Sequence, residues 1–137
     1  MDSTPWSAET VATWMASMGD RECLLVLRSE PSSIYGWGAI KSYSPRAGYR
    51  TTCEISLYLD SEECGKGFGD HLLEALIHHA REAGIHHIVA KTLASNVRSR
   101  QFHEIHGFEL VGVQKEVGRI AGQWQDVAIY QLLLPEN

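Results

Sequence analysis

The most constraining feature of this sequence is a strand-like run that leads through a glycine-rich stretch into an apolar helix pattern. Residues 53–59 (CEISLYL) have the alternation of a strand, and residues 64–69 (CGKGFG) follow a short polar turn. Leu72, Leu73 and Leu76 then fall at helical spacing. Glycine lets a ligand approach the backbone closely, and the first N–H groups of a helix have no partner inside it. The stretch therefore indicates a site for a phosphate-bearing small molecule at the start of the helix.

The spacing of the glycines excludes two common phosphate-binding motifs. The dinucleotide-binding fingerprint has glycine or alanine at its sixth position, where this chain has Asp70. The P-loop lysine precedes serine or threonine, whereas Lys66 precedes Gly67. A glycine-rich turn that binds no ligand is the alternative interpretation of this stretch.

Length and composition indicate one ordinary domain. The 137 residues are 44% hydrophobic and 21% charged, which is enough for a core without disulfides or metals. The net charge of −5 argues against an extended nucleic-acid surface, and no apolar run approaches membrane-spanning length. The three cysteines and seven histidines lack metal-site spacing, and the N-terminal residues do not have a signal-peptide pattern. We therefore expect a reduced cytoplasmic protein that binds no metal, nucleic acid or membrane.

The order of the expected elements predicts the fold class. Helices are expected over residues 4–19, from the glycine-rich stretch to Gly84, and from Asn96 to His106, with Phe102 and Ile105 facing inward. Strands are expected over residues 23–28, 34–42, 53–59, 85–93, 108–113 and 124–134, with residues 116–123 as a glycine-bearing connection. This order predicts a single α+β domain over residues 1–137, in which helices pack on a sheet of mixed strand direction.

The strand over residues 53–59 brings three polar-capable side chains to one face. Alternation puts Glu54, Ser56 and Tyr58 on one side and the apolar side chains on the other, which resembles the lining of a cleft. Glu54 is either a solvent-facing residue or a partly buried carboxylate. In the second case desolvation would raise its pKa, which suits a general base.

The loop before this strand contains two arginines close to a tyrosine. Arg46 and Arg50 flank Tyr49. Such a group is either a solvated loop or a clamp for a ligand carboxylate.

Several of these motifs together resemble one known family. Residues 64–69 resemble the acetyl-CoA pyrophosphate loop of the GNAT superfamily of N-acetyltransferases, whose pattern is Arg/Gln-x-x-Gly-x-Gly/Ala. Asn96, Ser99 and residues 103–108 (HEIHGF) resemble the second half of that site, at matching spacing.

The match is closer to the phosphinothricin and methionine sulfoximine acetyltransferase subgroup, through residues 46–58 (RAGYRTTCEISLY) and 118–126 (GRIAGQWQD). Compared with that subgroup, the chain begins at the second helix and lacks the usual first strand and helix, which help to wall the acceptor pocket. Cys64 also stands where the family has Arg or Gln. We expect the loop to bind CoA all the same, because its phosphate contacts are mostly backbone N–H groups.

The resemblance implies a GNAT-like α+β fold with a mixed, mostly antiparallel sheet and helices on both faces. It implies an N-acetyltransferase, here as a homodimer, that moves the acetyl group of acetyl-CoA to the primary amine of a small amino-acid-like acceptor by direct attack in a ternary complex. Acetyl-CoA would lie in a splay between residues 53–59 and residues 85–93. A backbone N–H near Leu59 would polarise the thioester carbonyl.

The resemblance also implies residue roles. Glu54 would be the general base, and His103 would protonate the departing thiolate unless it is a packed helix histidine. The implied acceptor-binding residues are Arg46, Tyr49 and Arg50. The implied acetyl-CoA-binding residues are Leu57, Tyr58, Leu59, Cys64, Gly65, Lys66, Gly67, Phe68, Gly69, Asn96 and Ser99.

Three other functions compete with this one. The chain could be an acyl-CoA-binding module without turnover, which the absent N-terminal elements favour. It could be an enzyme with Cys64 as nucleophile, since a helix N-terminus acidifies a thiol. It could also be a structural domain without a ligand, against which the joint spacing of the glycine and Asn96 motifs argues.

Overall fold

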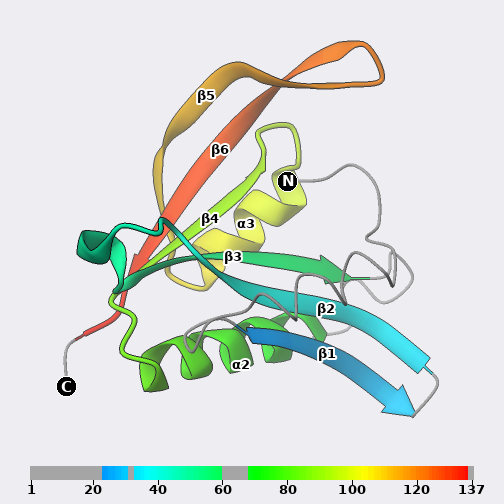
Figure 1. The fold of residues 1–137 in the computed structure, drawn as a ribbon. Helices are drawn as coiled ribbons and strands as arrows, with labels where there is room; N and C mark the ends of the chain where they lie inside the picture. The colour runs from blue at the N-terminus through cyan, green and yellow to red at the C-terminus, as the bar shows by residue number, and fades with distance from the viewer. Residues whose placement is uncertain (1–22, 31–32, 60–67, 136–137) are drawn as a thin grey trace.

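The computed structural model of the protein describes residues 23–30, 33–59 and 68–135. The helix expected over residues 4–19 and the glycine-rich residues 64–67 lie outside these ranges. Neither α-helix in the described ranges is long and apolar enough to cross a membrane. The described elements are β1 (Cys23–Glu30), β2 (Ser33–Ser42), the 3-10 helix η1 (Ala47–Tyr49), β3 (Thr52–Leu59), α2 (Phe68–Glu82), β4 (His87–Leu93), α3 (Val97–Ile105), β5 (Glu109–Ile120) and β6 (Gln123–Leu133) (Figure 1).

The six strands form one sheet in the order β1-β2-β3-β4-β6-β5. β3 and β4 are parallel, and all other neighbours in the sheet are antiparallel. β3 and β4 are parallel because α2 lies between them in the sequence and leads the chain from the end of β3 back to the start of β4. The mixed, mostly antiparallel sheet expected from the sequence is therefore confirmed.

α2 covers the face of the sheet formed by β1, β2 and β3 (Figure 1). Leu73 and Leu76 of this helix are fully buried. Gly38 on β2 leaves the room that the helix needs, because a Cβ there would lie 2.6 Å from Leu76 Cδ1. Gly84 follows the end of the helix with a φ of 82°, a conformation that favours glycine and stops a helix.

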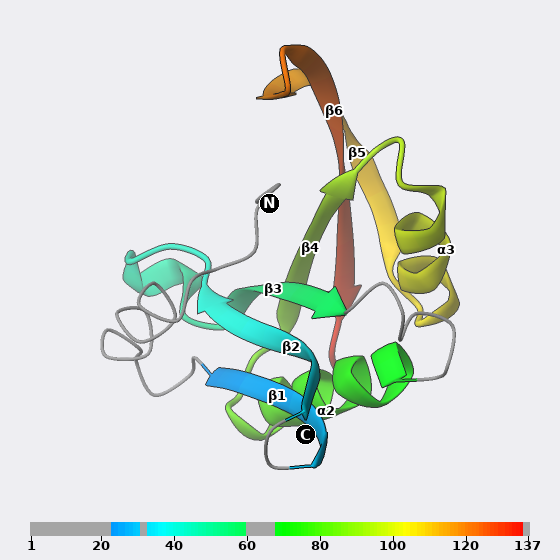
Figure 2. The ribbon, with the colours of Figure 1, turned by 90° about the vertical axis from the view of Figure 1, so that its right-hand side faces the viewer.

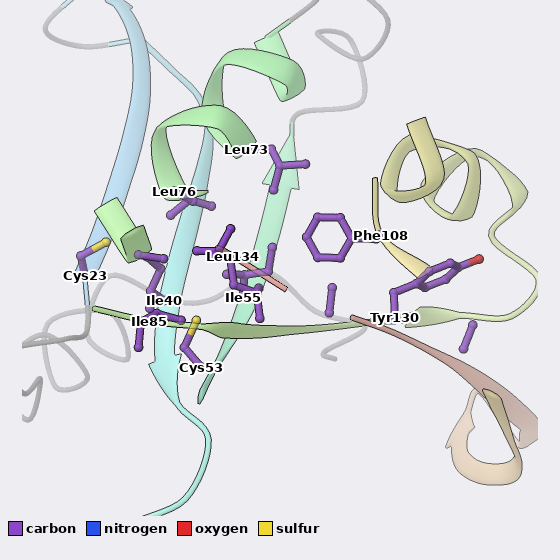
Figure 3. Packing of buried hydrophobic residues seen from close by; sticks show 14 residues of the cluster. Cys23, Ile40, Cys53, Ile55, Leu73, Leu76, Ile85, Phe108, Tyr130 and Leu134 are labelled. Carbon is purple, nitrogen blue, oxygen red and sulfur yellow. The ribbon is translucent and has the colours of Figure 1, made fainter. Parts of the chain in front are cut away.

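The hydrophobic core lies between α2 and the sheet and continues along the same face toward α3, where Phe108 and Tyr130 belong to it (Figure 3). Burying this apolar surface is the main stabilising contribution that the fold can make. The side chains of the core cluster are those of Cys23, Ile40, Cys53, Ile55, Leu73, Leu76, Ala80, Ile85, Ile88, Ala90, Phe108, Ala128, Tyr130 and Leu134.

α3 packs on the same face of the sheet as α2. The hydroxyl of the buried Tyr130, on β6, donates a hydrogen bond to Glu104 of α3. His106, just after α3, lies with its Nε2 2.6 Å from Asp70 Oδ1 in the first turn of α2. The two described helices therefore cover one face. The remaining helix of the sequence prediction, residues 4–19, lies outside the described ranges.

One prediction for α3 is wrong. Sequence spacing predicts that Phe102 and Ile105 both face inward, but only Phe102 packs against the core, and Ile105 is 81% exposed. The inward side of this helix is centred on His103, which is 7% exposed. Ile105 follows two residues later, about 200° around the helix, and so points away from the sheet.

A second correction concerns the hairpin of β5 and β6, which projects beyond the helices (Figure 1). The sequence predicts a connection over residues 116–123, but β5 continues to Ile120 and the turn is formed by Ala121 and Gly122. These two residues have φ values of 50° and 79°. Two positive φ values are typical of the type I′ turn, whose twist suits a two-residue hairpin.

A bulge interrupts this hairpin halfway along. Gln114 and Gly118 of β5 are paired with β6 residues that are only two positions apart, so the residues between them bulge out. Glu116 at the bulge has a φ of 52°, and its N–H donates to Asp126 Oδ1 at 2.8 Å. The Asp126 side chain therefore accepts the hydrogen bond of the Glu116 N–H, for which the interrupted β5–β6 pairing provides no backbone acceptor.

Candidate functional site

β3 and β4 are paired only along their first halves. Their register begins at Thr52 with His87 and ends after four pairs, at Ile55 with Ala90. Beyond this point β3 remains paired with β2 and β4 remains paired with β6, so the two strands diverge (Figure 2). We call this divergence the splay. Along the splay, the backbone N–H and C=O groups of β3 and β4 that face each other are not paired with each other. They can bind an extended ligand that has amide groups of its own.

The expected ligand-binding residues of β3 lie at the splay. Leu57, Tyr58 and Leu59 all come after the last residue of β3 that pairs with β4. The Leu57 side chain packs against the core, so only the backbone of Leu57 is available to bind a ligand in the splay. Tyr58 lies on the other face, 44% exposed, and stacks on Trp37 of β2 with ring centroids 6.2 Å apart.

Glu54 lies on β3 just before the strands diverge. It is opposite Lys41 on β2 and Val89 on β4. Its side chain is 21% exposed, and its Oε1 lies 3.4 Å from Nζ of Lys91. Of the two interpretations of Glu54, the partly buried carboxylate fits this environment.

The two faces predicted for β3 are observed. Cys53 and Ile55 are buried on the helix-covered side, whereas Glu54 and Ser56 are partly exposed on the other. Burial raises the pKa of the Cys53 thiol to about 12, and the neighbouring Cys23 and Glu54 act in the same direction. Cys53 is therefore an inert core residue and not a nucleophile.

The start of α2 is tied to the end of α3. α2 begins at Phe68, and Gly69 in its first turn is buried. The contact of His106 with Asp70 joins this turn to the end of α3. The free N–H groups of a helix N-terminus attract anions, so this end of α2 is suited to phosphate. The preceding residues Cys64–Gly67 lie outside the described ranges, and their role stays a prediction.

Asn96 caps α3 as the sequence predicts. Its Oδ1 accepts a hydrogen bond from the N–H of Ser99 at 3.0 Å. Asn96 is exposed and Ser99 is partly exposed. The cap occupies the amide oxygen of Asn96, which leaves its NH₂ group and the Ser99 hydroxyl for a ligand.

His103 lies inside the domain, between α3 and β6. Its Nδ1–H donates to the carbonyl oxygen of Ser99 at 2.8 Å, and its ring stacks on Tyr130 with centroids 5.8 Å apart. Burial lowers the pKa of His103 below its ordinary value of 6.5, although the hydrogen bond to Ser99 acts in the opposite direction. These contacts fit a packed helix histidine better than a proton donor.

Glu54 and His103 approach the start of the splay from opposite faces of the sheet. Tyr130, on which His103 stacks, is paired with Ala90, the last residue of β4 that pairs with β3. Glu54 lies on the other face, since its neighbour Ile55 is buried in the core. The structure thus brings these two predicted residues to one region without direct contact.

The predicted acceptor-binding residues lie on the exposed loop between β2 and β3. Arg46, Tyr49 and Arg50 are all exposed around η1, and Tyr49 contacts Tyr43 with ring centroids 5.5 Å apart. The loop leads into Thr52, two residues before Glu54. The loop therefore enters β3 at the end away from Leu57, Tyr58 and Leu59, and it is close in sequence to Glu54.

Residues 118–126 form the outer part of the hairpin. The guanidinium carbon of Arg119 lies 4.9 Å from the centroid of the Trp124 ring, and Arg119 Nε donates to the Gly122 carbonyl at 3.4 Å. This cation–π contact orders the tip of the hairpin.

One candidate was missed in the sequence. Lys91 on β4 forms the ion pair with Glu54, but the two residues are far apart in the chain and only the strand register brings them together. The sequence contains one signal for such a partner: Lys91 lies within an apolar run, and a charged residue inside a central strand needs a partner of opposite charge. No group of three or more potential metal ligands was found in the part of the chain that the structure describes.

Residues 2–129 match the family model of the acetyltransferase (GNAT) domain. The chain belongs to the GNAT acetyltransferase family. It is 36% identical over 111 residues to the L-methionine sulfoximine/L-methionine sulfone acetyltransferase of Pseudomonas paraeruginosa, an alignment that covers 81% of this chain and 64% of the relative. The chain therefore spans less than two thirds of the length of this curated relative.

Solved GNAT structures share the fold. The phosphinothricin acetyltransferase from Sinorhizobium meliloti in complex with acetyl-CoA has a TM-score of 0.84 at 30% identity, with 95% of this chain and 70% of that one covered. The ribosomal-protein-alanine N-acetyltransferase from Brucella melitensis has a TM-score of 0.86 at 32% identity, with 96% and 81% covered. The GNAT-like α+β fold expected from the sequence is confirmed.

Proposed function

We propose that this GNAT domain is an N-acetyltransferase that moves the acetyl group of acetyl-CoA to the primary amine of a small amino-acid-like acceptor. One observation supports this most: a partly buried carboxylate, Glu54, stands where two parallel strands part. The unpaired strand edges suit the amide-bearing arm of the coenzyme, and the carboxylate suits the amine that must lose a proton.

The proposed reaction is a direct transfer in a ternary complex. Glu54, directly or through one water, takes a proton from the acceptor ammonium, because only the free amine is nucleophilic. The nitrogen then attacks the thioester carbonyl carbon, and a backbone N–H near Leu59 stabilises the oxyanion that forms. The attack forms the N–C bond and gives a tetrahedral intermediate, which collapses when the C–S bond breaks and CoA leaves as a thiolate. The nitrogen loses its second proton in this collapse and the thiolate takes up one proton, so the products are the amide and the thiol of CoA.

His103 is the protein group that could supply that last proton, from the opposite face of the sheet. Its burial and its contacts with Ser99 and Tyr130 support a packing role instead. His103→Gln separates the two roles. If the imidazole donates the proton, the variant should have a lower kcat and an unchanged free energy of unfolding. If the imidazole is a packed core group, the variant should have a lower free energy of unfolding.

The proposed coenzyme site combines the splay with the start of α2. The strand edge of Leu57, Tyr58 and Leu59 would bind the extended arm, and the glycine-rich residues before Phe68 would bind the diphosphate. The solved relative from Sinorhizobium meliloti was determined with acetyl-CoA, which supports the same coenzyme for this chain.

The acceptor is proposed from the relatives and from the loop around η1. The curated relative is named for methionine sulfoximine and methionine sulfone, both of which combine a primary amine with a carboxylate. Arg46 and Arg50, with Tyr49 between them, lie on the exposed loop that leads into β3, the strand of Glu54, and would bind that carboxylate.

The experiment that tests this function compares Glu54→Gln with Glu74→Gln, a change of the same chemistry on the exposed side of α2. CoA release is followed with a panel of amino acids, sulfoximines and polyamines, and acetyl-CoA binding is measured by calorimetry. We expect Glu54→Gln to lower kcat by roughly 10²-fold or more while the Kd for acetyl-CoA stays within about twofold. Glu74→Gln should match the wild type.

Two results would contradict the proposal. Acetyl-CoA binding without CoA release for any amine would make the domain a binding module. Equal losses of kcat and coenzyme affinity in Glu54→Gln would make Glu54 a structural residue. Within the glycine-rich stretch, Gly67→Val should abolish binding, because a side chain there keeps the phosphates from the backbone.

We also propose a cytoplasmic homodimer. The hairpin exposes several apolar side chains, namely Leu110, Val111, Val113, Val117 and Trp124, each between 39% and 58% exposed. Such a cluster is typical of a contact surface. Light scattering during size-exclusion chromatography tests it, and a monomer at micromolar concentration would refute the dimer.

A further inference from the structure

Lys91 is held across the splay from Glu54. It follows Ala90 on β4 directly, so it is the first residue of that strand without a partner on β3. Its Nζ lies 3.4 Å from Glu54 Oε1, on the face of the sheet opposite α2 and α3. The ion pair therefore connects the two strands at the point where their backbones part.

The charged surroundings of Glu54 make Lys91 its specific partner. On β2 Lys41 is directly opposite Glu54 in the register, and on β4 His87 lies two residues before Val89, the partner of Glu54. Glu54 nevertheless forms its ion pair with Lys91, which lies diagonally across from it on β4, and not with Lys41, which lies directly opposite on β2. The carboxylate is thereby drawn along the sheet toward the diverging halves of the strands.

We propose that Lys91 is a positioning residue for acyl transfer, which holds the Glu54 carboxylate at the mouth of the splay. The proposal rests on the proposed function. A glutamate side chain has several rotatable bonds. An ion pair that fixes its carboxylate reduces the conformational entropy that is lost when the side chain adopts the reactive orientation. The proton of the acceptor ammonium moves to Glu54, while Lys91 keeps its own protons throughout.

The test uses Lys91→Gln and Lys91→Arg, with Lys41→Gln as the matched control on the neighbouring strand. The kcat, the two KM values and the melting temperature are measured with the best acceptor of the panel. Lys91→Gln should lower kcat by about tenfold, because a misplaced catalytic group costs up to ~10²-fold, and should leave KM for acetyl-CoA within about twofold. Lys91→Arg should recover most of the rate, and Lys41→Gln should lose little.

A double substitution separates positioning from simple structural support. In a Glu54→Gln background, Lys91→Gln should have almost no further effect on kcat, because the lysine acts through the carboxylate that has already been removed. A purely structural lysine would instead lower kcat by the same factor in both backgrounds and would lower the melting temperature as well.

Each remaining outcome decides between the two proposals. An active wild type with an equally active Lys91→Gln variant overturns the positioning role alone. A higher KM for the acceptor at unchanged kcat also overturns it, because the lysine would then bind the acid group of the substrate. A wild type that releases no CoA with any amine overturns the proposed function, and the positioning role with it.

Discussion

Removing one hydroxyl group from the centre of the domain should cost a measurable part of its stability. Tyr130 is fully buried on β6. Its hydroxyl donates to Glu104 Oε2 at 2.9 Å and accepts from Arg100 Nε at 3.0 Å. Arg100 also donates to the Ala94 carbonyl at 3.2 Å, so the hydroxyl is the central link between β6, α3 and the end of β4. Tyr130→Phe removes that link and keeps the ring.

The magnitude follows from these two hydrogen bonds. A hydrogen bond to a charged group contributes about 1.5–3 kcal/mol when it is buried. Glu104 is exposed and Arg100 is partly exposed, so water can replace part of each lost bond, which reduces each contribution to about 1 kcal/mol. Phenylalanine leaves no cavity, so no packing loss is added. We expect Tyr130→Phe to lower the free energy of unfolding by about 2 kcal/mol and the melting temperature by roughly 5–10 °C.

Urea unfolding measures this loss, with the m-value checked for equality between variants. Tyr43→Phe is the matched control, since the Tyr43 ring is 47% exposed. A cycle of Tyr130→Phe and Glu104→Gln isolates the pairwise contribution. A loss below about 0.5 kcal/mol at an unchanged m-value would refute the reasoning, because it would show that the buried hydroxyl contributes nothing net.

Three further predictions concern packing, pH and thiol reactivity. Gly38→Ala should lower the free energy of unfolding by about 1–3 kcal/mol, because its methyl group would lie 2.6 Å from a buried leucine of α2; a neutral change would show that the helix shifts freely. Since burial lowers the pKa of His103 in the folded state, the unfolded state binds more protons below about pH 6.5, and stability should fall as the pH decreases from there. His103→Gln should make that acid slope in urea unfolding shallower, and an identical slope would assign it to other groups. In a Cys64→Ala variant, the buried thiols of Cys23 and Cys53, whose pKa values are raised by burial, should react with a disulfide reagent at about pH 8 only after denaturation; reaction of the folded protein would contradict the core assignment.

The sequence predicts those elements best whose ends have a local chemical cause. Asn96 as an N-cap, and Gly84 and Gly107 after the two helices, act through their own backbone and nearest neighbours. Both glycines have positive φ, 82° and 88°. Such signals do not depend on the remainder of the fold, so α2 and α3 end within one or two residues of the predictions.

The hairpin shows where local signals mislead. Gly118 and Gly122 together indicate a loop, but Gly118 is a paired strand residue and only Gly122 belongs to the turn. The other turn residue, Ala121, has a φ of 50°, which alanine rarely adopts without tertiary support. The bulge at Glu116 depends on Asp126 from the partner strand, which no local pattern reveals.

The candidate site was predicted only in part for a related reason. The face of Glu54 follows from alternation along one strand, which the sequence displays directly. Its partner Lys91 depends on the register between two parallel strands separated by a helix, and no local rule fixes that register. The exposure of Ile105 has the same origin, because the inward side of α3 is set by its packing against Phe108, just before β5, and Tyr130 of β6.

The break between β3 and β4 coincides with a division in the order of the chain. β1, β2, β3 and α2 come from residues 23–82, and β4, α3, β5 and β6 come from residues 87–133. Four residue pairs join the two sets of strands in the described sheet. A chain cut at Gly84 would keep every antiparallel strand pair within one fragment, while neither fragment would hold both edges of the splay. The domain is therefore suited to fragment complementation, in which recovered coenzyme binding reports that the two pieces have reassembled.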